Sequence, residues 1–147
     1  MASNYPMTGF HFMVTWNPED EENVSFSEVS GLNVSTTAIE YREGSDKQYT
    51  TLKMPGLRKY NNVTLKRGTM AKDNGFFAWF DKINNNTVER RSIKIMLLNE
   101  DHEAVITWTL NNAFPVKYDP GSLNASKGEV LIESIELAYE SFTVTRK

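Results

Sequence analysis

Two β-rich runs, Phe26-Ser-Glu-Val-Ser-Gly-Leu32 and Asn62-Val-Thr-Leu-Lys-Arg-Gly68, enclose the segment that decides the fold of this chain. Between them lie Glu40-Tyr-Arg-Glu-Gly44 and Lys53-Met-Pro-Gly-Leu-Arg-Lys-Tyr60, two pieces rich in charge, glycine and tyrosine. β-branched and aromatic residues favour strands in the flanking runs, whereas compact domains rarely carry so long an excursion without a use for it. Residues 40–60, approximately, are therefore predicted to form a long extended arm that contacts another chain.

Apolar and polar residues alternate along much of the remaining chain, and this pattern predicts antiparallel strands that each bury one face. The first strand is expected over residues 10–16, and the second over about 26–41. Gly31 lies inside the second run, where glycine is typical of a bulge or a sharp bend. After the arm, the pattern around Val63 and Leu65 predicts the returning strand.

The C-terminal half predicts a hairpin followed by one long last strand. The hairpin joins residues 93–97 to residues 105–110 through the polar turn Asn99-Glu-Asp-His102. The last strand is expected over about 129–144, where Ile135, Leu137 and Tyr139 alternate with polar residues. Such regular alternation predicts one buried face and one wet face.

A single helix is predicted at about residues 73–84. Asp73 or Asn74 is suited to cap its start, and Asn84-Asn-Asn86 is suited to end it. A stripe of apolar side chains recurs at helical spacing on Phe76, Phe77, Phe80 and Ile83. We interpret this stripe as the face that packs on a sheet, rather than as a shelf for a ligand.

Composition indicates one globular domain, residues 1–147, with 39% hydrophobic and 12% aromatic residues. Sixteen basic and 19 acidic residues give a net charge of −3, which disfavours a protein that coats nucleic acid. There is no cysteine, so disulfides, zinc–thiolate sites and thiol nucleophiles are excluded. No run reaches the roughly 20 apolar residues of a membrane span, and no secretory signal is visible, so stable membrane association is not expected.

Residues that could carry chemistry are few and scattered. His11 and His102 are far apart in the sequence and lack further metal ligands at workable spacing. Ser27 and Ser30 lack the motif of a serine nucleophile, and no glycine-rich phosphate loop is present. The acidic pair at 100–101 belongs to a solvated turn, where a raised pKa is hard to obtain. We therefore predict no catalytic residue, no metal site and no cofactor.

The segment from Phe26 to Gly68 resembles the tail tube proteins of contractile phages and of phage-tail-like contractile injection systems. The resemblance covers nearly the whole chain, and further pieces continue it in the same order: Tyr5-Pro-Met-Thr-Gly-Phe-His-Phe12, the aromatic helix at 76–80, Glu89-Arg-Arg91, Leu97-Leu-Asn-Glu100 with His102-Glu103, and Asn112-Ala-Phe-Pro-Val-Lys117. Each piece alone is weak, but their conjunction is specific. The type VI secretion tube is a cousin, less favoured because the motifs at 40–44 and 53–60 are similar to the phage-tail branch.

This resemblance implies a mainly β fold: a β-sandwich or partly open antiparallel barrel with one flanking helix and a long arm. It implies a homohexameric ring with a lumen lined by β-strands, and rings that stack into the rigid inner tube of an injection machine or phage tail. A contractile sheath, baseplate and spike proteins and a terminator are the implied partners, with protein cargo or phage DNA in the lumen. The particle would be assembled in the bacterial cytoplasm and would act at the envelope of a target cell.

Candidate assembly residues follow from the arm and from the polar faces of the strands. Complementary charges on the arm predict contacts between subunits, and the interface residues are Tyr41, Arg42, Glu43, Lys53, Met54, Pro55, Leu57, Arg58, Lys59 and Tyr60. The expected lumen residues are Ser35, Thr37, Lys66, Glu136 and Glu140. The basic and aromatic group at 58–60 and 66–67 is also typical of a single-strand nucleic-acid platform, but the acidic total and Glu40 count against that reading.

Two other classes of protein are kept as alternatives. The first is a monomeric β-sandwich that binds a ligand, and the formation of rings or tubes by the purified protein would separate it from a tube subunit. The second is an enzyme, for which a buried polar cluster would be the first support.

Overall fold

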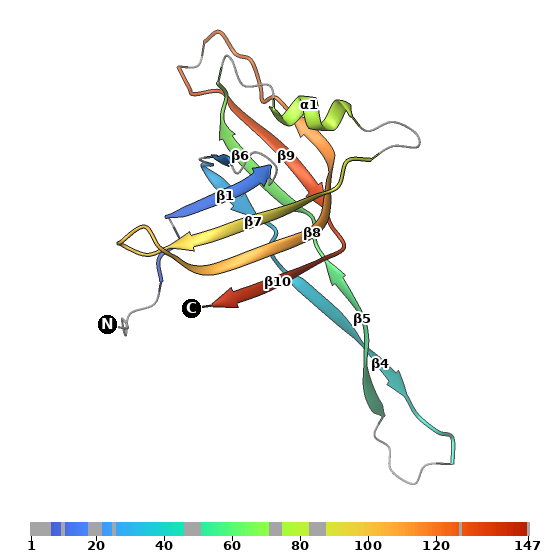
Figure 1. Ribbon diagram of the computed structural model, residues 1–147. Coiled ribbons are helices and arrows are strands. Elements are labelled where there is room, and N and C mark those ends of the chain that lie inside the picture. Colours follow the sequence, from blue (N-terminus) through green and yellow to red (C-terminus); the bar gives the residue numbers. More distant parts are fainter. Residues whose placement is uncertain are drawn as a thin grey trace.

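The chain folds into a two-layered β-structure with one helix among its described residues, as the computed structural model shows (Figure 1). The structure describes residues 7–9, 11–17, 22–24, 26–45, 51–70, 75–82, 88–126 and 128–146. The elements are β1 Phe12–Asn17, β2 Glu22–Val24, β3 Glu28–Ser30, β4 Val34–Tyr41, β5 Leu52–Tyr60, β6 Val63–Gly68, α1 Gly75–Asp81, β7 Arg91–Leu98, β8 Ala104–Asp119, β9 Ile132–Ala138 and β10 Ser141–Arg146. The predicted mainly β class with one flanking helix and an extended arm is confirmed.

The long strand β8 belongs to both layers, because eight strands form one sheet that folds over at this strand. The first half of β8 pairs with β7 and β10, and β1 and β2 follow beyond β7. The second half pairs with β9, and β6 and β3 follow beyond β9. We call these groups the first layer and the second layer. The change occurs near Asn112, whose φ of 55° lies in the left-handed region that asparagine tolerates better than most residues.

The prediction of one last strand over 129–144 is wrong, because this segment contains two strands, β9 and β10. Both pair with β8: Ala138 lies opposite Phe114 in the second layer, and Ser141 lies opposite Asn111 in the first. Since β8 changes layer at Asn112, the chain opposite it must bend as well, and it does so at residues 139–140.

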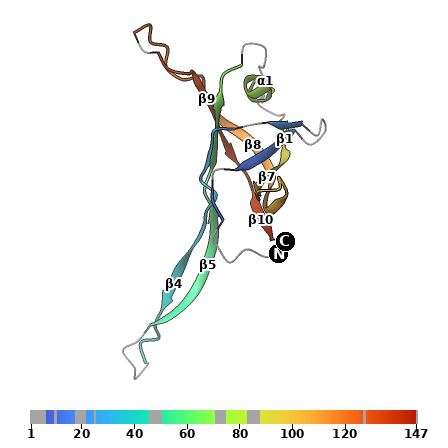
Figure 2. The ribbon, with the colours of Figure 1, turned by 90° about the vertical axis from the view of Figure 1, so that its left-hand side faces the viewer.

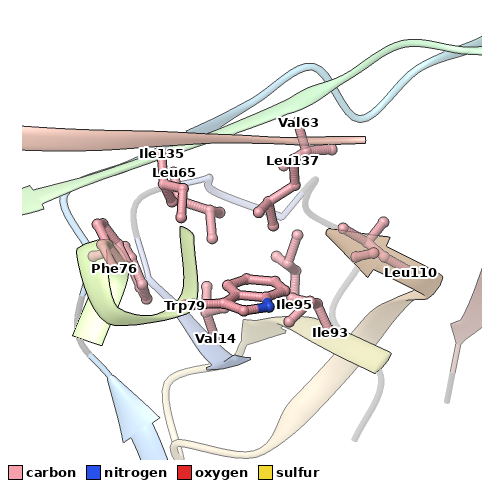
Figure 3. Packing of buried hydrophobic residues seen from close by; sticks show 12 residues of the cluster. Val14, Val63, Leu65, Phe76, Trp79, Ile93, Ile95, Leu110, Ile135 and Leu137 are labelled. Carbon is pink, nitrogen blue, oxygen red and sulfur yellow. The ribbon is translucent and has the colours of Figure 1, made fainter. Parts of the chain in front are cut away.

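The core lies between the two layers and beside the helix (Figure 3). Val63, Leu65, Ile135 and Leu137 enter it from the second layer, and Val14, Ile93, Ile95 and Leu110 enter it from the first. These residues are buried, and along each strand they are spaced by two, as the alternation predicted. Among the described residues no helix is long and apolar enough to cross a membrane.

Helix α1 covers one side of this core, although the predicted stripe is only partly correct. Phe76 and Trp79 point into the core and are buried, whereas Phe77 is 43% exposed and Phe80 is half-buried (Figure 3). Residues three apart share a face of a helix, so the inward position after Phe76 is Trp79 and not Phe77. Asp73, Asn74 and Ile83, to which the cap and the rest of the stripe were assigned, lie outside the described residues.

The predicted arm is a two-stranded antiparallel ribbon, β4 and β5, that projects away from the body (Figures 1 and 2). The ribbon begins at the pair Val34 and Tyr60, earlier than the predicted position 40. The two strands already pair from Val34 onward, whereas the charged residues from which the arm was predicted begin only at Glu40. We call residues 34–60 the arm from here on.

Candidate functional site: assembly surfaces

The base of the arm is a kink that only glycine permits at one position. Gly31, between β3 and β4, has a φ of 94°, and an added Cβ atom would lie 2.1 Å from the carbonyl oxygen of Asn62. Beside it the backbone N–H of Asn61 donates to the carbonyl oxygen of Asn33 at 3.2 Å, and the Asn61 side-chain amide donates to the Asn33 side chain. This cross-strand pair fixes the direction in which the arm leaves the body.

An aromatic cluster supports the same base from the body. The ring of Tyr60 lies 5.1 Å from the ring of Phe142 and 5.9 Å from that of Tyr139, between ring centres, with edge-on geometry. Burial, and then the neighbouring Tyr60, raise the pKa of Tyr139 above its ordinary value. Tyr60, predicted as an interface residue, is thus half-buried against its own chain.

Near the tip of the ribbon, the two faces of the arm differ in polarity. Residues directly opposite each other in an antiparallel pair share a face, as do residues two apart in one strand. Ile39 lies opposite Met54, and Tyr41 lies opposite Leu52, so these four exposed side chains form one apolar surface. We call it the arm face. The other side carries the pairs Glu40 with Lys53, Ala38 with Pro55, and Thr36 with Arg58.

The predicted interface residues are distributed over both sides of the arm. Tyr41 and Met54 belong to the arm face, and Lys53, Pro55 and Arg58 lie on the opposite side. The others lie elsewhere on the arm: Arg42 and Glu43 follow the end of β4, exposed Leu57 lies at an irregularity of the ladder, and Lys59 pairs with Ser35 near the base. Ile39 and Leu52 were missed. Alternation within each strand was visible in the sequence, but the register that joins the two strands was not.

The outer face of the second layer is polar and includes two of the predicted lumen residues. Val63 and Leu65 enter the core, so Lys66 points away from it. Leu137 also enters the core, so the preceding residue, Glu136, points away from the core as well. Lys66 Nζ lies 3.4 Å from Glu28 Oε2, and the side chain of Asn62 donates to Glu136 Oε1 at 3.3 Å. We call this surface the polar sheet face.

The other predicted lumen residues lie elsewhere. Ser35 and Thr37 are on the arm, and Glu140 lies in the connection between β9 and β10. Asn112 donates to Glu140 Oε2 at 2.8 Å, and Arg90 Nη1 lies 3.7 Å from Glu140 Oε1. The expectation that Glu136 and Glu140 share a face assumed one continuous strand, and the bend between them removes that basis.

The structure brings His11 and His102 together, although they are far apart in the sequence. Their ring centres are 4.4 Å apart, where the backbone N–H of Leu98 donates to the carbonyl oxygen of His11 at 2.9 Å. The residues that the structure describes contain no group of three or more His, Cys, Asp or Glu that could hold a metal ion. Within this described part, the pair therefore has no third protein ligand of the kind that catalytic zinc sites use.

A buried polar cluster is present among the described residues, and its geometry is that of a structural ion pair. Arg67 Nε lies 2.6 Å from Glu133 Oε1, and both side chains are almost fully buried. The hydroxyl of Tyr118 donates to Glu133 Oε2 at 3.2 Å, and the guanidinium of Arg67 lies 4.0 Å from the ring centre of Phe76. Burial, and then the charge of Glu133, raise the pKa of Tyr118. The cluster ties β6, β8 and β9 to the helix.

A second set of contacts holds the same face of the helix at Trp79. Trp79 Nε1 donates to the carbonyl oxygen of Glu89 at 2.9 Å, and the guanidinium of Arg91 lies 4.5 Å from the centre of the indole. Burial raises the pKa of Glu89, but hydrogen bonds from Lys82 and Arg91 outweigh this effect and hold the pKa below its ordinary value. These groups are engaged in holding the helix.

Known proteins resemble the chain over nearly its whole length. The family model of the T4-like virus tail tube protein gp19 matches residues 8–143. A chain in the structure of the anti-feeding prophage cap is 33% identical, with a TM-score of 0.89 over 100% of this chain and 95% of that one. A chain of the sheath–tube complex of PVC, an extracellular contractile injection system, is 31% identical, with a TM-score of 0.88 over 98% and 94% of the two chains.

A more distant structure shares the fold alone. Hcp1 from Flavobacterium johnsoniae is 15% identical, with a TM-score of 0.56 over 94% of this chain and 97% of that one. No curated protein matches the chain.

Proposed function

The chain belongs to the family of the T4-like virus tail tube protein gp19 and is a structural tube subunit of that kind, and from this premise we propose that its copies close into hexameric rings that stack into a hollow conduit. The match over residues 8–143 carries this proposal, because it includes the arm and both layers. The tube would be driven through a target envelope when a surrounding sheath contracts.

The edges of the second layer support ring closure. One edge of this layer is β3. The other edge is the second half of β8, because the pairing of β8 with β7 ends at Ala113, opposite Arg91. Beyond these limits neither edge pairs with another strand in the described part of the chain. Unpaired edges expose N–H and C=O groups, and head-to-tail joining of copies removes them when the rotation closes. The edge of β3 in one copy would meet the edge of β8 in the next.

The polar sheet face would then line the lumen. A conduit must let cargo slide, and Lys66, Glu28 and Glu136 place charges of both signs on this surface. Ser35 and Thr37 would extend the lining along the arm, and Glu140 would lie at its margin.

The partners follow from the relatives. Related chains occur in structures of a sheath–tube complex, a sheath–tube terminator and a baseplate, and this subunit would contact the corresponding proteins of its own particle. Protein cargo or phage DNA would occupy the lumen. The chain would act as one domain without catalysis, and would be assembled in the bacterial cytoplasm.

The experiment is size-exclusion chromatography of the purified protein followed by negative-stain electron microscopy. Rings or tubes are the expected result, whereas a monomer that stays monomeric at high concentration would support the ligand-binding alternative. A variant with a shortened arm gives a second test: an Asn-Gly turn replaces residues 42–51 and joins the opposed pair Tyr41 and Leu52. This variant should fold but form no tubes, and normal tubes would show that the distal arm is not needed for assembly.

A further inference from the structure

Two histidine side chains meet at one end of the first layer, away from the arm and from the polar sheet face. His11 directly precedes β1, and His102 lies in the turn between β7 and β8. Their ring centres are 4.4 Å apart, and the ring planes are tilted by 58°. Figure 1 shows the tip of the β7–β8 hairpin beside the start of β1. We call these two residues the histidine pair.

Backbone hydrogen bonds hold both members of the histidine pair in place. The carbonyl oxygen of His11 accepts from the backbone N–H of Leu98 at 2.9 Å, which extends the pairing of β1 with β7. His102 has a φ of 65°, and its backbone N–H donates to the carbonyl oxygen of Asn99 at 3.1 Å. Asn99 Oδ1 also accepts from the backbone N–H of Glu103 at 2.9 Å, which closes the turn. The two rings therefore approach each other without any rearrangement of the backbone.

The spacing of the two rings suits a shared metal ion. In the described part of the chain neither ring has a hydrogen bond or an ion pair with another residue, and a neutral imidazole has one nitrogen that can bind a metal. Metal–nitrogen bonds of about 2.1 Å place an ion about 3 Å from each ring centre, so two rings at a right angle around the ion have centres about 4.5 Å apart. The observed separation of 4.4 Å matches this arrangement.

The charge around the histidine pair favours a cation. The turn carries Glu100, Asp101 and Glu103, and no lysine or arginine occurs in residues 5–16 or 95–105. A local excess of negative charge raises the concentration of cations near a surface. The described residues contain no group of three or more His, Cys, Asp or Glu that could hold a metal, so these carboxylates act through their field and not as ligands. Water would complete the coordination.

We propose that the histidine pair binds one divalent transition-metal ion, Ni²⁺ or Cu²⁺, with water in the remaining positions. Two imidazole nitrogens at a right angle together with water oxygens form the tetragonal set of ligands that is typical of these two ions. The ion would tie the start of β1 to the β7–β8 turn. Both ligands come from one copy, so this inference does not depend on the proposed tube function.

Isothermal titration calorimetry of the untagged, unassembled protein with NiCl₂ tests the site. We expect one Ni²⁺ per chain. His11→Gln and His102→Gln should each weaken binding by at least about tenfold, since loss of a ligand costs no less than loss of a group that supports one. Glu103→Gln is the matched control: it removes a charge but no ligand, so it should weaken binding by less than about fivefold.

Two further measurements on the unmodified protein do not depend on the folding of the variants. Ni²⁺ should raise the Tm, because an ion that binds only the folded chain stabilises it by mass action. Electron paramagnetic resonance of bound Cu²⁺ should show coupling to two imidazole nitrogens. Thermal scans without metal confirm that each variant is folded before its affinity is compared with that of the parent.

Several outcomes would overturn the inference. Absence of Ni²⁺ and Cu²⁺ binding up to about millimolar concentration would show that the two rings only pack against each other. Binding that survives either glutamine substitution, or a Cu²⁺ spectrum without coupling to two nitrogens, would place the ion elsewhere. Because these measurements use unassembled subunits, a failure to form rings or tubes would contradict the proposed function and leave this inference unaffected.

Discussion

Trp79 is the side chain whose removal should cost the folded subunit most. It is 1% exposed, it fills the space between helix α1 and both layers, and its indole N–H donates to the carbonyl oxygen of Glu89 (Figure 3). Truncating a buried tryptophan to alanine costs about 3–5 kcal/mol through lost burial and the cavity left behind. The lost hydrogen bond contributes about 1 kcal/mol, which largely overlaps with that figure. We therefore expect Trp79→Ala to lower the free energy of unfolding by about 4 kcal/mol.

The assay is urea unfolding of the monomer, followed by far-ultraviolet circular dichroism because the substitution removes a fluorophore. Assembly links stability to concentration, so both proteins are measured at a concentration where neither forms rings. A lower midpoint with an unchanged slope is the expected result. In a thermal scan the same loss corresponds to a fall of about 8–16 °C in Tm, at about 2–4 °C per kcal/mol.

Phe77→Ala is the matched control, since it also truncates an aromatic residue to alanine in the same helix. Phe77 is 43% exposed and contacts Tyr118 at 5.7 Å between ring centres, so a loss of about 1 kcal/mol is expected. Equal losses for the two variants, or a loss below about 1 kcal/mol for Trp79→Ala, would refute the assignment of Trp79 as the residue that anchors the helix.

Three further results are expected. Glu133→Gln should lower the free energy of unfolding by about 3–5 kcal/mol because it breaks a buried ion pair, whereas the double variant Arg67→Met with Glu133→Leu should recover most of that loss. Urea unfolding compares the two variants, and a double variant as unstable as the single one would contradict this account. Tyr139 has a raised pKa and a buried hydroxyl with no hydrogen-bond partner among the described residues. Folding therefore favours its neutral form, and the stability from this group is present below the unfolded pKa near 10 and is lost as the pH rises through the folded pKa. Tyr139→Phe should unfold no more easily than the parent protein at neutral pH and should lose less stability above pH 10. Identical curves of stability against pH would show that this hydroxyl does not titrate differently in the folded state. Single cysteines at Thr37 and Glu136 in assembled tubes should react with a small maleimide but poorly with one too bulky to enter the lumen, and equal labelling by both reagents would place these residues on the outside.

Local patterns in the sequence were enough to predict the class of the fold. Alternation of apolar and polar residues identified Val63 with Leu65, and Ile135 with Leu137, as inward pairs, because side chains of a strand point to opposite faces by geometry alone. The turn at 99–102 was predictable for a similar reason: Asn99 accepts hydrogen bonds from the backbone N–H groups of Asp101 and Glu103, a local bond that asparagine commonly makes. The family was also predicted from motifs in the chain.

The functional surfaces depended on contacts between distant residues. Arg67 meets Glu133, His11 meets His102, and both pairs join segments that no local pattern connects. The arm face exists only because the register sets Ile39 opposite Met54 and Tyr41 opposite Leu52.

Within an unbroken strand, the sequence by itself determined which residues share a face, since that depends on a period of two residues along one chain. Tertiary structure alone decided that β8 serves two layers and that the last segment bends at residues 139–140. These choices depend on which strands pair and in which register, and register is set by packing across the whole fold.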